Sequence, residues 1–440
     1  MTVRSTLPAP DSGDPAPPGG AWRGPERRGP RRAASGARGA PRTTVDVTAV
    51  VVAHDGERWL PEVLAALGDS TVAPRRTIAV DTGSSDATAT LLAGATGRCL
   101  DRVVVADRRL GYGAAVQAGL DVERDASSGP SAWIWLLHDD CAPAPDALAR
   151  LLEQASASPS IALLGAKARD WDDPRVLVEV GLSTDRAGHR ATGLERREQD
   201  QGQHDGVRDV LAVGTAGALV RRDVWDALGG LDKMLPVFRD DLDLGWRVNA
   251  AGHRVVVVPA SVVRHARAAT TGQRRLHAAR GRAEGIDRRH ALLVMLAHAP
   301  AAVFPLVVLR LAVATLVRVL GFLLTRRPVR AADELAAAAD VLLHPGRLSV
   351  ARRARAQSRT LPARALRPLF ASGWGRSAAR ADALRGWLTG AQGPVGSRLG
   401  ALGDIGSFDG DGDGDGDGDG YRAAVVADRL PLARILRRPP

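Results

Sequence analysis

The stretch VTAVVVAHDGERWLPEVLAAL (residues 47–67) carries the clearest fold signal in this 440-residue chain. Its first seven residues are valine, alanine and a single threonine, a β-branched and largely apolar run as in a strand that is buried on both faces. Apolar residues then recur at helical spacing, at Leu60, Val63, Leu64 and Leu67. A buried β-strand followed by an amphipathic helix is therefore predicted.

The same alternation continues along the chain. Further strands are predicted at 76–81, 101–107, within 133–143 and at 161–167, and helices at 84–94, 111–122 and 144–155. This order is typical of the α/β class, a mostly parallel sheet with helices on both faces. After residue 168 the pattern loosens, and the polar segment 170–209 is a candidate lid or acceptor-facing region. Regularity returns with a strand and short helix at 210–232, a helix within 238–253 and two short strands within 254–265.

Polar groups follow three of the predicted strands. The groups are Ala53-His54-Asp55, the segment from Asp81 to Asp86, and His138-Asp139-Asp140. Parallel strands end at one edge of a sheet, and ligands of such sheets bind beyond that edge. Adjacent carboxylates repel each other unless a cation or polar ligand meets them. A ligand site is therefore predicted at this edge.

Charge is unevenly distributed over the chain. The net charge is +11 overall, but residues 45–263 carry −9 and residues 264–330 carry +11. The basic segment also contains the apolar run 291–325, so a membrane surface with basic flanks is favoured over nucleic acid as a partner. The run is long enough for a tilted spanning helix, a helical hairpin or an interfacial segment, and a packing helix of a soluble domain is the alternative.

The two cysteines, Cys99 and Cys141, form no disulfide or zinc pattern, which fits a reducing compartment. No apolar signal segment stands near residue 1, so the protein, or at least its middle, is expected to face the cytosol. The predicted regions are a disordered tail (1–44), an α/β domain (45–268), a basic linker (269–290), an apolar membrane-associated or transmembrane segment (291–325), an arginine-rich helical region (326–400) and an acidic tail (401–440). The Asp-Gly run at 408–421 lacks the glutamate of an EF-hand and is interpreted as a flexible linker.

Two acidic pairs are suited to different chemistry. Asp139-Asp140 ends a predicted strand and offers the oxygen ligands that a divalent cation prefers, with His265 as a further ligand. Asp240-Asp241 begins a predicted helix, where carboxylates commonly act as caps. A carboxylate beside another also holds a proton more easily, which suits a general base.

Seven segments in this order resemble the family 2 nucleotide-sugar glycosyltransferases with the GT-A fold. They are VVVAHDGERWLPEVLAAL, VDTGSSDAT, LGYGAAVQAGL, WLLHDDCAP, GTAGALVRRDVWDALGGLD, FRDDLDLGWRVNAAGH and VVRH, and together they cover residues 47–268. The resemblance implies an inverting transfer of a sugar from a nucleotide diphosphate to an acceptor hydroxyl, with Mg²⁺ or Mn²⁺. The basic apolar segment is similar to membrane-associated members from GC-rich bacteria that build cell wall or exported polysaccharide, which implies a glycan or lipid-linked acceptor at the cytoplasmic face of the membrane.

The resemblance also implies roles for individual residues. Donor contacts are expected from Ala53, His54, Asp55, Glu57, Asp81, Gly111, Gly113 and Asp139. The metal is expected on Asp140, His265 and His138, and catalysis on Asp241 as the base with Asp240 beside it. Gly214, Thr215, Gly217 and Trp246 are expected on the acceptor side.

Two positions depart from the family pattern. His138 stands where the family has the first acid of its DxD motif, and Asp240 stands where it has glutamate. Retention of Asp140 and Asp241 favours an active enzyme. The alternatives are a catalytically inactive nucleotide-sugar-binding or scaffold protein of the same fold, and a metal phosphohydrolase that uses His138 and Asp139.

Overall fold

A computed structural model of the chain describes residues 42–124, 129–195 and 197–371. The described residues from Thr43 onward belong to one compact unit. The predicted tail up to residue 41 and the predicted acidic linker at 401–440 lie outside the described residues.

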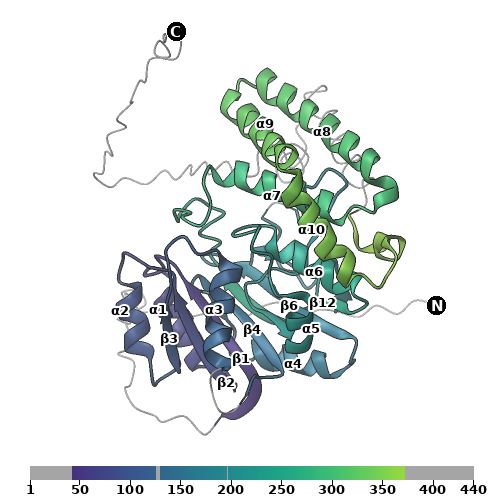
Figure 1. Ribbon diagram of the computed structural model, residues 1–440. Helices are drawn as coiled ribbons and strands as arrows, with labels where there is room; N and C mark the ends of the chain where they lie inside the picture. Colours follow the sequence, from purple (N-terminus) through teal and green to yellow (C-terminus); the bar gives the residue numbers. More distant parts are fainter. Residues whose placement is uncertain (1–41, 125–128, 196, 372–440) are drawn as a thin grey trace, which may run out of the picture. The chain divides into compact units, whose positions relative to one another are not determined.

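The main sheet follows the strand order β10-β12-β6-β11-β4-β1-β2-β3 (Figure 1). These strands are β10 (Arg208–Asp209), β12 (Arg254–His265), β6 (Ile161–Asp170), β11 (Ala218–Arg221), β4 (Trp133–His138), β1 (Thr43–Ala53), β2 (Val72–Asp81) and β3 (Arg102–Val105). Two short strands join at the sides, β5 (Cys141–Pro143) on β12 and β7 (Leu177–Glu179) on β6. A separate hairpin pairs β8 (Ser183–Thr184) with β9 (Arg190–Ala191).

The predicted α/β class is confirmed, with a mixed rather than uniformly parallel sheet. Strands β3, β2, β1 and β4 are parallel, and so are β6 and β12. Strand β11 lies between the two groups and is antiparallel to both β4 and β6. The parallel ends of β1, β2 and β4 therefore meet at one edge, as predicted.

Helices cover both faces of the sheet because the strand side chains alternate. Odd-numbered residues of β1 such as Val51 pack with α1 (Leu60–Gly68), α2 (Thr88–Ala95) and α4 (Ala147–Ser156). Even-numbered residues such as Val50 pack with α3 (Tyr112–Arg124), α5 (Arg222–Leu228) and α6 (Asp240–Ala250). A strand with two covered faces needs apolar residues throughout, which explains the unbroken valine run.

The two short strands predicted within 254–265 form one strand, β12. Its pairing with β6 shifts register between Val258 and Val262. Pro259 lies in this irregular segment, where the missing N–H of proline breaks no ladder bond. The proline therefore interrupts the pairing without ending the strand.

The apolar run 291–325 is not one membrane segment, and the predicted linker 269–290 is not wholly a linker. Helix α7 spans Ala283–His298, and its residues 291–298 are buried in a core shared with α6. Ala299 is extended before Pro300, as expected for a residue that precedes proline. The short 3₁₀ segment η1 (Ala301–Val303) then leads into α8 (Phe304–Leu324).

The described chain ends in further helices: α9 (Pro328–Leu343), α10 (Pro345–Ser358) and the 3₁₀ segment η2 (Ala363–Leu369). A buried polar network ties this region to the enzyme domain. Asp243 of α6 accepts hydrogen bonds from Arg355 of α10 and Arg247, and its carboxylate contacts His298 of α7 at 2.8 Å. Among the described residues one helix, 301–324, is long and apolar enough to cross a membrane, which by itself is weak evidence that it does.

Candidate active site

A cavity of about 520 Å³ lies at the predicted edge of the sheet. It is lined by the ends of β1 and β4, the β8–β9 hairpin, the start of α6, the loop 266–282 after β12, and residues of α7, α8 and α9. Both acidic pairs, Asp139-Asp140 and Asp240-Asp241, line this one cavity although a hundred residues separate them.

Asp139 is completely buried at the end of β4. Its carboxylate accepts a hydrogen bond from the His54 backbone N–H at 2.8 Å and one from Arg274 at 2.7 Å. Burial raises the pKa of Asp139 to about 6, with Asp140 adding to the effect against the opposing charge of Arg274. Gly56 leaves room for this carboxylate, because a Cβ on Gly56 would stand 2.1 Å from its Oδ2.

The three predicted metal ligands come together. Asp140 Oδ1 lies 3.4 Å from His265 Nε2 and 3.8 Å from His138 Nδ1, and the ligand atoms of the three residues all lie within 4.8 Å of one another. Its other oxygen accepts a hydrogen bond from the Ala268 backbone N–H at 2.8 Å. Burial, reinforced by the charge of His265, lowers the pKa of His138 to about 3, so the imidazole is neutral at pH 7. A neutral imidazole is the form that binds metal.

The donor set therefore fits a divalent cation. Burial by itself would raise the pKa of Asp140, but His265, Arg274 and His138 outweigh it and hold this pKa below the usual range. The Asp140 carboxylate is therefore ionised. His138 Nε2 lies 2.9 Å from Thr215 Oγ1, which leaves Nδ1 on the side of Asp140. Two imidazoles and one carboxylate are a known ligand set for divalent transition-metal ions.

The second pair occupies the first turn of α6. Arg190, from β9, binds both carboxylate oxygens of Asp241 at 2.5 and 2.7 Å. Burial by itself would lower the pKa of Arg190, but the charges of Asp241 and Glu179 outweigh it and raise the pKa of Arg190. Asp240 behaves differently: burial and the charge of Asp241 raise its pKa to about 7. The Asp241 carboxylate is thus held by the Arg190 guanidinium, while Asp240 has a raised pKa.

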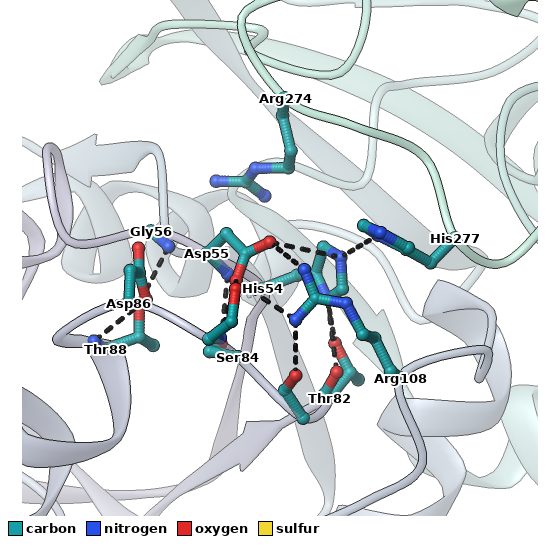
Figure 2. A network of polar contacts seen from close by, with 12 residues as sticks. His54, Asp55, Gly56, Thr82, Ser84, Asp86, Thr88, Arg108, Arg274 and His277 are labelled. Atoms are coloured by element: carbon teal, nitrogen blue, oxygen red, sulfur yellow. Dashed lines mark hydrogen bonds and ion pairs between the residues drawn. The ribbon is translucent and has the colours of Figure 1, made fainter.

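The loop 266–282 lies over the first acidic pair. His277 Nδ1 approaches His54 Nε2 to 2.9 Å, and His54 Nδ1 contacts the Thr82 carbonyl oxygen at 3.1 Å (Figure 2). Arg274 of the same loop reaches Asp139. Burial lowers the pKa of His54, which favours its neutral form. Two strands and the loop therefore meet at His54.

Other predicted donor residues lie next to the cavity lining with partners of their own. Asp55 pairs with Arg108 in Figure 2 and accepts a hydrogen bond from the Ser85 N–H at 2.8 Å. Glu57 accepts from the Ala87 N–H at the start of α2, and Asp81 accepts from Ser84. The Ala53 carbonyl accepts from the Thr82 N–H. These residues hold the loop after β1 against the loop after β2, and their donor contacts stay predictions.

Two predicted glycines have a packing reason. A Cβ on Gly111 would stand 2.6 Å from Pro236, and one on Gly113 would stand 2.6 Å from Leu231. Neither glycine lines the cavity, whereas Tyr112 between them does. Both glycines admit the segment 231–236, whose Pro236 carbonyl accepts a hydrogen bond from the Tyr112 N–H, and their approach to the donor stays a prediction.

The predicted acceptor residues divide into two groups. Gly214 and Thr215 line the cavity, and the Gly214 N–H donates to Glu179 at 2.6 Å. Gly217 adopts φ +88° away from the lining, with its Cα facing Val263. Trp246 is buried against His298, at 4.1 Å between ring centroids, in a core cluster of α6, α7 and the helices after them. Gly217 and Trp246 are not among the residues that line the cavity, and their acceptor roles stay predictions.

Sequence reasoning missed several residues that line the cavity. They are Arg108, Tyr112, Glu179, Arg190, Arg274 and His277. Tyr112 lies between two glycines that had drawn attention, and a neighbouring aromatic ring was a usable signal. Glu179 and Arg190 lie in the irregular segment 170–209, where no periodicity shows which side chains face inward.

Comparison with known proteins agrees with this architecture. The model of Glycosyltransferase like family 2 matches residues 41–282. A curated relative, N-acetylglucosaminyl-diphospho-decaprenol L-rhamnosyltransferase of Mycobacterium tuberculosis, is 28% identical over 244 residues, which cover 51% of this chain and 77% of the relative. The O-antigen biosynthesis protein RfbC of Myxococcus xanthus is 42% identical over 55 residues, 12% of this chain and 4% of that protein.

Solved structures with a related arrangement have low similarity scores. The mannosyltransferase PcManGT of Pyrobaculum calidifontis, in complex with GDP-Man and Mn²⁺, has a TM-score of 0.39 at 17% identity, covering 72% of this chain and 85% of that one. S. aureus TarS 1–349 with UDP has 0.42 at 12% identity, covering 71% and 88%. GalNAc-T7 with UDP, GalNAc and Mn²⁺ has 0.41 at 16% identity and covers 56% of this chain, which spans about half of the GalNAc-T7 chain (47%). On the family match, which covers more than half of its length, the chain belongs to glycosyltransferase family 2.

Proposed function

We propose that the protein transfers a sugar, with inversion, from a nucleotide-diphosphate sugar to an acceptor hydroxyl. The observation that carries the proposal is the meeting of two acidic pairs in one cavity, one beside two histidines and the other at the start of α6. A glycosyl transfer needs both kinds of group, because a diphosphate leaves while a hydroxyl loses its proton.

The first group would hold the donor. His138, Asp140 and His265 would bind Mg²⁺ or Mn²⁺, which when bound neutralises charge on the departing diphosphate. His54 and Asp139 are the predicted donor residues whose side chains line the cavity. Arg274 of the loop 266–282 stands beside Asp139 and adds a positive charge that favours a phosphate-bearing ligand.

The second group would activate the acceptor. Asp241 takes the proton of the acceptor hydroxyl, whose oxygen attacks the anomeric carbon as the bond from that carbon to the diphosphate breaks. Arg190 donates to both oxygens of the Asp241 carboxylate and so orients it. Burial and the charge of Asp241 raise the pKa of Asp240 to about 7, so Asp240 carries only part of a negative charge beside the base near neutral pH.

The names of two relatives support a proposed acceptor class. The mycobacterial relative is named for a sugar transfer to a diphospho-decaprenol acceptor, and the Myxococcus relative for O-antigen biosynthesis. A glycan or lipid-linked acceptor in cell-wall or exported-polysaccharide synthesis, used at the cytoplasmic face of the membrane by a hexosyltransferase-type enzyme, is therefore the proposed role. Nucleic acid is not a proposed partner.

The decisive variant is Asp241→Asn. We expect transfer to fall about 10²- to 10⁴-fold, because the general base is lost while the side-chain shape is kept. Donor binding, measured by calorimetry with Mn²⁺ and the nucleotide sugar found in a thermal-shift screen, should be unchanged. Trp246→Phe, in the core on the same helix, is a matched control for damage to α6.

The outcomes separate the alternatives. Donor binding with no turnover by the unmodified protein on any acceptor would indicate the binding or scaffold protein. Release of nucleotide diphosphate at the same rate with and without an acceptor would indicate a phosphohydrolase. Full activity of Asp241→Asn would exclude Asp241 as the base.

A further inference from the structure

Helix α8 has an outward face made entirely of apolar residues. Leu306, Leu309, Leu316, Val317 and Leu320 are between 50% and 62% exposed. The other exposed residues of α8 are Pro305, Ala312, Val313, Leu323 and Leu324. A surface helix of a soluble protein normally turns charged and polar residues outward. This face therefore has the composition of a buried surface.

The opposite face of α8 packs against the protein. Val307, Leu311, Val319 and Phe322 are buried there at a spacing of three, four or eight residues. The same side carries polar contacts: Arg318 donates to Glu334 of α9 at 2.6 Å, and Arg288 of α7 donates to Glu334 at 2.9 Å. For α8 to cross a bilayer, these charged neighbours would have to enter the hydrocarbon with it, which is costly. The packing favours a helix that lies on the membrane.

Helix α9 repeats the pattern beside α8 (Figure 1). Its exposed large residues are Val329, Leu335, Leu342 and Leu343, each at least 54% exposed. The other exposed residues between them are alanines at 332, 336 and 339. The outward faces of α8 and α9, here named the α8–α9 platform, together form a two-helix apolar surface. Contiguous apolar surfaces of this kind mark interaction sites.

The charge around the platform indicates its partner. Residues 301–371 contain 12 arginines and 3 acidic residues, a net charge of +9. Arg326, in the turn between α8 and α9, and Arg347, in the first turn of α10 directly after α9, are exposed. Basic residues beside an apolar face suit the anionic surface of a bilayer. A second copy would instead bring two clusters of like charge together, which disfavours a dimer through this surface.

Helix α8 also connects the platform to the cavity. Arg318 and Phe322 line the cavity, while Leu316 and Leu320 of the same helix face outward. We propose that the α8–α9 platform lies flat on an anionic bilayer, with its leucines among the acyl chains, so that one wall of the cavity stands at the headgroup region. That the cavity takes a lipid-linked acceptor from this bilayer rests on the proposed function, whereas membrane binding itself does not.

The test measures binding of the full chain to vesicles without any donor or acceptor. Flotation is compared for phosphatidylcholine vesicles with and without phosphatidylglycerol. We expect binding at least about ten-fold stronger to the anionic vesicles, because several exposed arginines add to the apolar term. The variant Leu316→Glu with Leu320→Glu should reduce binding by about ten-fold or more, because two charges would enter the interface.

Val105→Glu is the matched control. Val105 is 76% exposed on β3, outside the platform, so its replacement adds a charge at an exposed apolar position and should leave vesicle binding unchanged. Circular dichroism of all variants checks that they fold. The double variant should keep transfer to a water-soluble acceptor and lose transfer to a vesicle-borne one.

Four results would overturn the proposal. The first two are no binding to either kind of vesicle and equal binding to neutral and anionic vesicles. The third is an equal loss of vesicle binding in the double variant and in Val105→Glu. The fourth is resistance of the bound protein to extraction by alkaline carbonate, which would show a spanning helix. A concentration-dependent dimer without vesicle binding would assign the platform to a second copy. None of these results depends on whether the protein transfers sugar, so failure of the proposed function would be seen separately.

Discussion

Two pairs of adjacent aspartates face the same cavity, yet their surroundings give them different chemistry. The first pair, Asp139-Asp140, ends a buried strand and receives backbone N–H groups, two histidines and Arg274. The second pair begins a helix and receives Arg190 on one member only. The comparison shows that the dipeptide itself does not set the role: partners from distant segments do.

The largest expected effect tests the first pair. Asp140→Asn should lower transfer about 10³-fold or more, roughly 4 kcal/mol, because an amide is a weak ligand for a hard cation. Removing divalent ions with a chelator should lower transfer by the unmodified enzyme to the same extent. It should lower transfer by the variant little further. Activity is measured with and without added Mn²⁺. Restoration of the unmodified enzyme's activity in the variant by ordinary Mn²⁺ levels would contradict the assignment.

The second effect concerns stability and separates the two members of the second pair. The folded-state pKa of Asp240 is raised to about 7, so the native chain holds a proton that the unfolded chain releases near pH 4. Stability from this group is therefore present below about pH 4 and is lost as pH rises to 7, at no more than about 1.4 kcal/mol per pH unit.

Asp240→Asn keeps the neutral form at every pH. In denaturant titrations of the metal-free protein, the free energy of unfolding of the variant should exceed that of the unmodified protein by about 2 kcal/mol at pH 8. At pH 4 the two free energies should be equal. Transfer should stay within about ten-fold of the unmodified enzyme, in contrast to Asp241→Asn. A stability difference that does not change with pH would show that the Asp240 proton is not responsible.

The smallest expected effect lies one contact away from the first pair. His277→Ala removes the partner of His54, whose backbone N–H holds Asp139. Loss of one such hydrogen bond costs about 1 kcal/mol, so donor affinity should fall about five-fold. His253→Ala, a half-buried histidine at the start of β12, is the control. Unchanged donor affinity in both variants would show that His277 does not help to position Asp139, which would then be held by Arg274 and the backbone alone.

Much of the fold could be read from periodicity. Buried parallel strands need long apolar runs, and β1, β2, β4 and β6 were predicted close to their observed positions. The antiparallel β11 could not be recognised as such, because strand direction leaves no mark in a four-residue segment. Pro300 offered a signal that the apolar run 291–325 is two helices, since the residue before a proline avoids helical geometry.

The candidate site divides along similar lines. His138, Asp140 and His265 were expected together because strand ends in a parallel sheet meet at one edge, and they lie within one cluster. Arg190 and Glu179 come from the irregular segment 170–209, and Arg274 comes from a loop. Loop side chains follow no period, so only the folded chain shows that these three reach the acidic pairs.

The sequence alone thus determined the α/β class, the edge where polar residues gather and the family resemblance, because each depends on local patterns repeated along the chain. Tertiary structure decided that Arg190 pairs with Asp241 and that the buried neighbour Asp240 has a raised pKa. It also decided which half of the apolar run is buried in α7 and which half is turned outward on α8. Burial and partner choice depend on segments distant in sequence, and no local pattern encodes them.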